Sequence, residues 1–129
     1  MARVPMRQGR ARSTAAVKPE LVKMSEAELQ DNVIKTARAF KWRVAHFRSV
    51  PVKHGDRVVY ETPVQADGAG FPDLLLVRER VVFAELKSET GRMSMAQQDW
   101  MFALREADAE RYIWFPKDWI SGEIEEVLR

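Results

Sequence analysis

The chain has 129 residues, of which 46% are apolar and 31% are charged, the usual composition of one globular domain. It contains no cysteine, which excludes disulfide bonds, thiolate zinc sites and cysteine nucleophiles. It has no run of about 18 apolar residues, the length that a membrane helix requires, and no apolar segment follows the basic N-terminus as in a secretory signal. We therefore expect a soluble cytoplasmic protein without membrane contacts.

Charge is distributed unevenly along the chain, although the net charge is only +2. Residues 1–23 carry six basic side chains and one acidic side chain, whereas residues 24–129 carry 15 basic and 18 acidic ones. A basic arm attracts polyanions such as nucleic acids, but a solvated tail without a specific role explains the charge equally well. Because residues 1–23 show little apolar periodicity, we expect a disordered arm there and a folded domain over residues 24–129.

The first part of the folded domain is predicted to contain a helix and a β-hairpin. Ser25 and Glu28 have the spacing of a capping box, and apolar residues then recur at helical spacing as far as Phe40. Residues 42–50 and 57–64 are rich in β-forming residues and flank a His-Gly-Asp turn signal. We expect these two strands to pair as a hairpin.

The second part of the domain alternates strands and helices. Two apolar runs, 74–77 and 81–87, predict buried strands joined by a tight Arg-Glu-Arg turn. They are followed by a predicted helix capped by Ser94, a strand over 111–115 and a final helix capped by Asp118. The apolar face of this final helix contains Ile120, Ile124, Val127 and Leu128. This order predicts a single α/β domain in which helices flank a mixed central sheet.

Three charged residues lie at the ends of the two central strands. Asp73 precedes the first strand, and Glu85 and Lys87 share one face at the end of the second, so all three are expected at the same end of the sheet. Two close carboxylates repel each other unless a cation lies between them, and Mg²⁺ binds through one or two carboxylates. A neighbouring lysine can orient an attacking water, which suits phosphodiester hydrolysis. A Glu-x-Lys pair alone is more simply a solvated ion pair.

The sequence resembles a nuclease family in several segments. Gly70-Phe71-Pro72-Asp73, followed after eleven residues by Glu85-Leu86-Lys87, resembles the motif of the PD-(D/E)xK nuclease superfamily. More narrowly, the region from about Ser25 to Leu128 resembles a stand-alone VRR-NUC (virus-type replication-repair nuclease) domain. The other matching segments are Ser25–Gln30, Lys41-Trp42 with His46, Ser94–Trp100 and Trp114-Phe115-Pro116. The resemblance implies a single-domain, restriction-endonuclease-like fold.

The resemblance also implies roles for individual residues. The residues with implied catalytic roles are Glu26, Asp73, Glu85, Lys87 and Gln97. Asp73 and Glu85, with the backbone carbonyl of Leu86, would bind Mg²⁺ or Mn²⁺. Lys87 would activate the hydrolytic water, and Glu26 would reach the site and assist metal or water binding. Gln97 would line the site.

The implied activity is that of a metal-dependent, structure-selective DNA endonuclease in repair, recombination or replication, acting at the nucleoid of a bacterial or phage-infected cell. Compact stand-alone members resemble homodimeric Holliday-junction resolvases, so branched DNA and a second copy of the chain are the expected partners. Three alternatives remain: a flap or single-site nicking nuclease, a non-catalytic nucleic-acid-binding module with the same fold, and, ranked lower, a sequence-specific cutter. Residues 53–69 match no motif of the family.

Several other residues have simple structural explanations. A strand histidine such as His46 is more often structural than functional, Glu28 is explained by the capping box, and Asp67 beside Gly68 is a turn former. We expect Trp100, Trp114 and Trp119 in the core or an interface rather than as base-stacking residues. Four basic residues lie around the predicted hairpin: Arg43, Arg48, Lys53 and Arg57. A contact with the DNA backbone and a solvated face explain them equally well.

Overall fold

The computed structural model describes residues 23–47, 50–61 and 63–129. The arm expected over residues 1–23 therefore lies, apart from Lys23, outside the described residues. Within the described ranges, no helix combines the length and the apolar character needed to cross a membrane.

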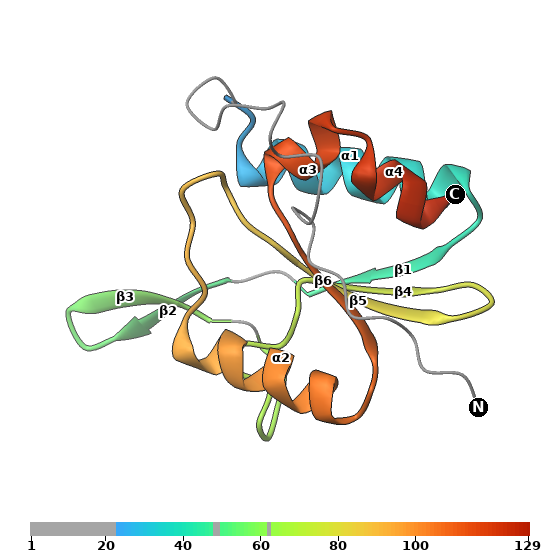
Figure 1. The fold of residues 1–129 in the computed structure, drawn as a ribbon. Coiled ribbons are helices and arrows are strands. Elements are labelled where there is room, and N and C mark those ends of the chain that lie inside the picture. Colours follow the sequence, from blue (N-terminus) through green and yellow to red (C-terminus); the bar gives the residue numbers. More distant parts are fainter. Residues whose placement is uncertain (1–22, 48–49, 62) are drawn as a thin grey trace.

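A four-stranded mixed sheet forms the centre of the fold (Figure 1). Its strands, in spatial order, are β1 (Arg43–His46), β4 (Leu74–Val77), β5 (Val81–Leu86) and β6 (Glu110–Trp114). The pairs β1–β4 and β4–β5 are antiparallel, whereas β5 and β6 are parallel and are connected through α2 (Met95–Glu106). The predicted α/β domain with a mixed sheet is confirmed.

Helices cover both faces of this sheet. The helices α1 (Glu26–Ala39), α3 (Pro116–Ile120) and α4 (Glu123–Leu128) lie on one face, and α2 lies on the other (Figure 1). The hydrophobic core lies between the sheet and the helices on the first face. It contains Leu29, Val33, Ala37, Trp42, Leu74, Leu76, Val82, Ala84, Leu86, Tyr112, Trp114, Ile124, Val127 and Leu128. Burial of each large apolar side chain stabilises the fold by about 1.5–3 kcal/mol relative to exposure.

The predicted hairpin exists, but one of its strands was assigned wrongly. It consists of β2 (Val50–His54) and β3 (Arg57–Glu61), which form a separate two-stranded sheet. The predicted first strand, 42–50, is divided between β1 and β2, and β1 pairs with β4 instead. The reason is the two-residue turn at Gly55 and Asp56, which pairs His54 with Arg57 and thereby selects the residues immediately before the turn as the partner strand.

The predicted final helix is two short helices. Asp118 does not cap it; it lies inside α3, where its carboxylate accepts a hydrogen bond from the Phe115 amide at 2.8 Å. Gly122 has a left-handed φ of 85° and separates α3 from α4, so Ile120 leaves the predicted apolar face and is 53% exposed. Ile124, with its neighbours Val127 and Leu128, is buried as predicted.

The loop before β4 packs against the first turn of α2 at Gly70. This glycine has a φ of +81°, and a Cβ there would lie 2.4 Å from the backbone carbon of Ala96. Gly55 has a similar φ of +62°, but a Cβ there would meet nothing within 4 Å. Alanine substitutions at the two positions therefore distinguish the effect of backbone strain from the effect of steric overlap.

The Gly70→Ala substitution is expected to lower the free energy of unfolding by about 2–5 kcal/mol, because left-handed strain and overlap with α2 add. Gly55→Ala introduces the strain alone and is expected to cost about 1–2 kcal/mol. Urea denaturation of the two variants beside the wild type measures both values. Equal losses in the two variants would show that α2 does not approach Gly70 closely.

Candidate active site

Two carboxylates meet at one end of the central sheet. Leu74 pairs with Ala84 in the antiparallel β4–β5 register, which places Asp73 opposite Glu85. One oxygen of Asp73, Oδ2, accepts a hydrogen bond from the backbone amide of Leu86 at 2.8 Å. Glu85 is only 2% exposed. The predicted meeting of the two acids is confirmed, while their role stays a prediction.

The N-terminus of α2 holds Glu85 and Lys87 together through one side chain. Gln97 accepts hydrogen bonds at Oε1 from Lys87 Nζ and from the Ser94 amide, both at 2.8 Å. Its Nε2 donates to Glu85 Oε2 at 2.9 Å, and Lys87 Nζ lies 3.5 Å from the same oxygen. Because Gln97 is also part of the capping box that begins α2, its amide is fixed by the helix and in turn fixes the acid and the lysine.

The surroundings of the two acids favour their protonated forms. Burial, followed by the charge of Asp73, raises the pKa of Glu85 to about 8. Burial also raises the pKa of Asp73, although its hydrogen bond from Leu86 acts in the opposite direction. Near neutral pH Glu85 therefore keeps a proton that a cation could replace.

Glu26 and His46 lie at the rim of the same site. The Ser25–Glu28 capping box begins α1 and leaves Glu26 in its first turn. Partial burial and then the charge of Asp73 raise the pKa of Glu26, while Lys87 lowers it, so Glu26 is electrostatically coupled to the site. His46, opposite Leu74 in the β1–β4 register, favours the ionised form of Asp73. Glu28 instead bonds the Ser25 amide at 3.1 Å, as predicted.

The residues present fit a hard divalent cation better than a softer metal. In the part of the chain that the structure describes, no three or more His, Cys, Asp or Glu side chains are grouped to hold a metal ion. The donors at this end of the sheet are the carboxylates of Asp73 and Glu85; the Leu86 carbonyl and Glu26 are further donors by prediction. Mg²⁺ or Mn²⁺ accepts such a set because it keeps several waters, whereas zinc sites require more nitrogen or sulfur ligands.

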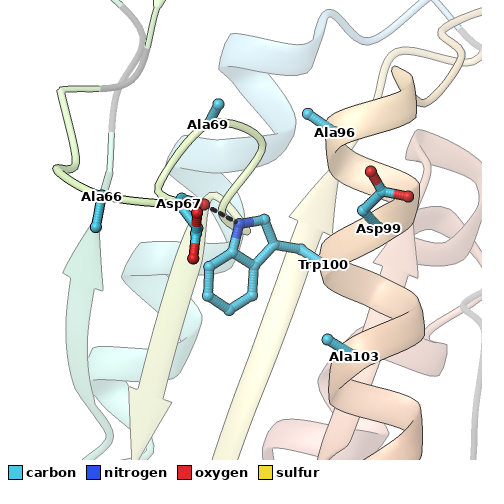
Figure 2. Close-up of a pocket in the computed structure, with 7 residues that line it drawn as sticks. All are labelled: Ala66, Asp67, Ala69, Ala96, Asp99, Trp100 and Ala103. Carbon is cyan, nitrogen blue, oxygen red and sulfur yellow. Dashed lines mark hydrogen bonds between the residues drawn. The ribbon is translucent and has the colours of Figure 1, made fainter.

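A groove opens beside the carboxylates. One cavity of about 450 Å³ is lined by Asp73 and Gln97 and also by Tyr60 and Val64. A second cavity of about 570 Å³ shares Ala66, Ala69 and Ala96 with the first and extends along α2. Figure 2 shows this second cavity between the loop that contains Asp67 and the helix that carries Asp99 and Trp100. The two cavities are adjacent, because they share these three alanines, and we refer to them together as the groove.

Trp114 and Trp119 lie in or against the core as expected, whereas Trp100 is half-buried and lines the second cavity, so its expected structural role stays a prediction. Trp100 Nε1 donates to the backbone oxygen of Asp67 at 2.8 Å (Figure 2). The Trp100 ring also packs edge-on against Phe71, with 4.9 Å between the ring centroids. Trp114 is fully buried, and Trp119 packs against the core. The aromatic residue that the sequence analysis missed is Tyr60, which lines the groove and is 70% exposed. No sequence signal marks it, because its position depends on the hairpin register.

Comparisons with known proteins identify the fold. No protein-family model matches the sequence, and no curated protein is significantly similar to it. A solved structure described as "VRR_NUC domain" aligns with a TM-score of 0.55 at 17% sequence identity, covering 80% of this chain and 97% of that chain. The chain has the fold of a VRR_NUC domain. The restriction-endonuclease-like architecture expected from the sequence is therefore confirmed.

In this VRR_NUC fold, three elements of the chain position the candidate site. Antiparallel β4 and β5 bring Asp73 and Glu85 together, the end of β5 leads to Lys87, and α2 adds Gln97. At 17% identity the comparison shows the fold. The chemistry must be argued from these residues.

Proposed function

We propose that the protein is a metal-dependent endonuclease that hydrolyses phosphodiester bonds in branched DNA. The observation that carries this proposal is the buried Glu85 carboxyl group, which lies opposite the half-buried Asp73 and is held beside Lys87 by Gln97. Holding two acids together away from water costs free energy unless a cation compensates their charge. A simple surface ion pair would not require such an arrangement. The VRR_NUC fold supports the same conclusion.

Each residue of the site has a distinct part in this proposal. Asp73, Glu85 and the Leu86 carbonyl would hold Mg²⁺ or Mn²⁺, which when bound polarises the phosphate and stabilises its developing negative charge. Water adds to phosphorus, and the bond from phosphorus to one sugar oxygen breaks. Lys87 orients that water and offsets the charge on the phosphate, since Gln97 fixes its ammonium group. Glu26 at the rim assists metal or water binding.

We further propose that the enzyme acts as a homodimer on four-way junctions. A junction has two-fold symmetry, and symmetrical cutting requires two sites, which a dimer with two-fold symmetry supplies. The test is cleavage of end-labelled four-way junction, flap and linear duplex with Mg²⁺ or Mn²⁺, together with sedimentation of the protein. Paired nicks across the junction by a dimer would support the proposal.

The other outcomes of this test identify the alternatives. Single nicks in flaps by a monomer would show a flap nuclease and would exclude the resolvase. Binding of all three DNAs without cleavage in either metal would show a non-catalytic DNA-binding module. Cleavage is read from the gel, the oligomeric state from sedimentation of the protein alone, and binding from its sedimentation with each DNA.

Gln97→Leu is expected to reduce cleavage by about 10- to 100-fold, the usual cost of losing a group that orients catalytic residues. Leucine keeps much of the volume but removes the bonds to Glu85 and Lys87. The control is Gln98→Leu, since the next glutamine is exposed and its side chain bonds only the Met93 carbonyl among the described residues. Single-turnover rates of the two variants should differ by at least about tenfold; equal rates would remove Gln97 from the mechanism.

A further inference from the structure

The hairpin formed by β2 and β3 has one half-buried face and one exposed face. Within the described ranges its strands pair only with each other, and Figure 1 shows the hairpin extending away from the central sheet. Val52 pairs with Val59 on the half-buried face. The exposed face carries the pairs Pro51–Tyr60 and Lys53–Val58. It is therefore largely apolar although it faces solvent.

Tyr60 connects this exposed face to the candidate active site. It is 70% exposed and lines the same cavity of about 450 Å³ as Asp73 and Gln97. Its side chain makes no hydrogen bond and no aromatic contact to any other residue that the structure describes. An aromatic ring without an internal partner, held on a strand beside reactive groups, is available to a bound ligand.

The surroundings of Tyr60 favour a nucleobase as that ligand. The ring offers a flat apolar surface, on which any base can stack with about 1–3 kcal/mol of binding free energy. Lys53 on the same face and Arg57 beside the hairpin turn supply cations that attract the phosphate backbone. In an intact duplex each base is already stacked between its neighbours. Only an unpaired nucleotide, at a branch, flap or frayed end, can therefore reach the ring without first being extruded.

We propose that Tyr60 stacks on an unpaired nucleobase next to the scissile phosphate, and that this contact selects branched DNA over intact duplex. The inference rests on the proposed nuclease function, and it adds the residue that distinguishes branched DNA from intact duplex. It assigns a role to the hairpin, for which the sequence offered no motif.

The test compares Tyr60→Ala with Tyr60→Phe and with a matched aromatic control, Phe102→Ala. Phe102 is 61% exposed on α2 and lines neither cavity of the groove. The probe is a DNA branch with one unpaired 2-aminopurine beside the junction, and its fluorescence is measured with Ca²⁺ in place of Mg²⁺. Cleavage of the same branch and of linear duplex is then measured with Mg²⁺.

Tyr60→Ala is expected to abolish the quenching of 2-aminopurine and to weaken binding of the branch by about 5- to 100-fold. The ratio of branch to duplex cleavage should fall by a similar factor. Tyr60→Phe should stay within about twofold of the wild type because the stacking surface remains, and Phe102→Ala should not differ from it.

Two results would overturn the inference. One is a Tyr60→Ala protein with wild-type quenching and a wild-type cleavage ratio. The other is a Tyr60→Ala protein that sediments as a monomer where the wild type is a dimer, which would assign this face to a second copy of the chain. Failure of the proposed function is recognised separately, because the wild type itself would then cut no DNA, while the fluorescence still reports stacking.

Discussion

Asp73→Asn is expected to reduce DNA cleavage by about 10³-fold and to abolish detectable Mn²⁺ binding, because the site loses one of its two carboxylates. Asparagine keeps an oxygen that can accept the hydrogen bond from the Leu86 amide, now at 2.8 Å, so the end of β5 should keep its conformation. Initial rates on labelled branched DNA and Mn²⁺ binding followed by electron paramagnetic resonance measure the two effects.

The matched control for this variant is Asp67→Asn. Asp67 lines the neighbouring cavity, its side chain is exposed, and only its backbone oxygen bonds Trp100. The control should cut DNA within about twofold of the wild type, as expected for a surface substitution. A similar loss of cleavage in both variants would mean that the total negative charge of the groove supports cleavage and that Asp73 has no specific role.

Glu85→Gln is expected to change activity and stability in opposite directions. The pKa of Glu85 is raised from 4.5 to about 8, so the folded protein binds this proton more tightly than the unfolded chain does. The wild type therefore loses stability as the pH rises from 4.5 to about 8, and the loss is complete above pH 8. Glutamine resembles the protonated acid and has no such loss, but it also gives up the charge that would bind the metal.

In buffer without divalent metal, the variant should be more stable than the wild type by about 1–3 kcal/mol at pH 9, and nearly equal to it at pH 5. Thermal unfolding at the two pH values measures this difference, and cleavage at pH 8 with Mg²⁺ should be lost. Glu106→Gln, at the exposed end of α2, is the control and should not change stability with pH in this way. An equal gain at both pH values would show that Glu85 does not bind its proton more tightly in the folded state.

The sequence predicted those parts of the fold that local chemistry determines. Ser25 and Ser94 begin helices because each forms a capping box, and both boxes are present. The two apolar central runs pair through the Arg78–Arg80 turn, which brought Asp73 opposite Glu85 as expected. Gln97 reached the site because the same capping box that begins α2 fixes its side chain.

The errors arose where a partner distant in sequence decides the structure. Residues 42–50 are rich in β-forming residues throughout, and only the pairing of β1 with β4 and the turn at Gly55 divide them between two sheets. The division of the last helix depends on Gly122, whose left-handed φ of 85° is not apparent from apolar spacing. Tyr60 lacks any local signal, since its contact with the groove depends on how the hairpin is placed.

The most direct test of the account is cleavage of a labelled four-way junction with Mg²⁺ by the wild type beside Lys87→Ala. Lys87 is 9% exposed and lies at the end of β5, and its ammonium group is hydrogen-bonded to Gln97 at 2.8 Å. We predict cleavage by the wild type that stops on removal of the metal and falls by about 10²-fold or more in the variant, while both proteins bind the junction. Equal cleavage by the two proteins, or cleavage that persists without divalent metal, would contradict a metal-dependent site built on Asp73, Glu85 and Lys87.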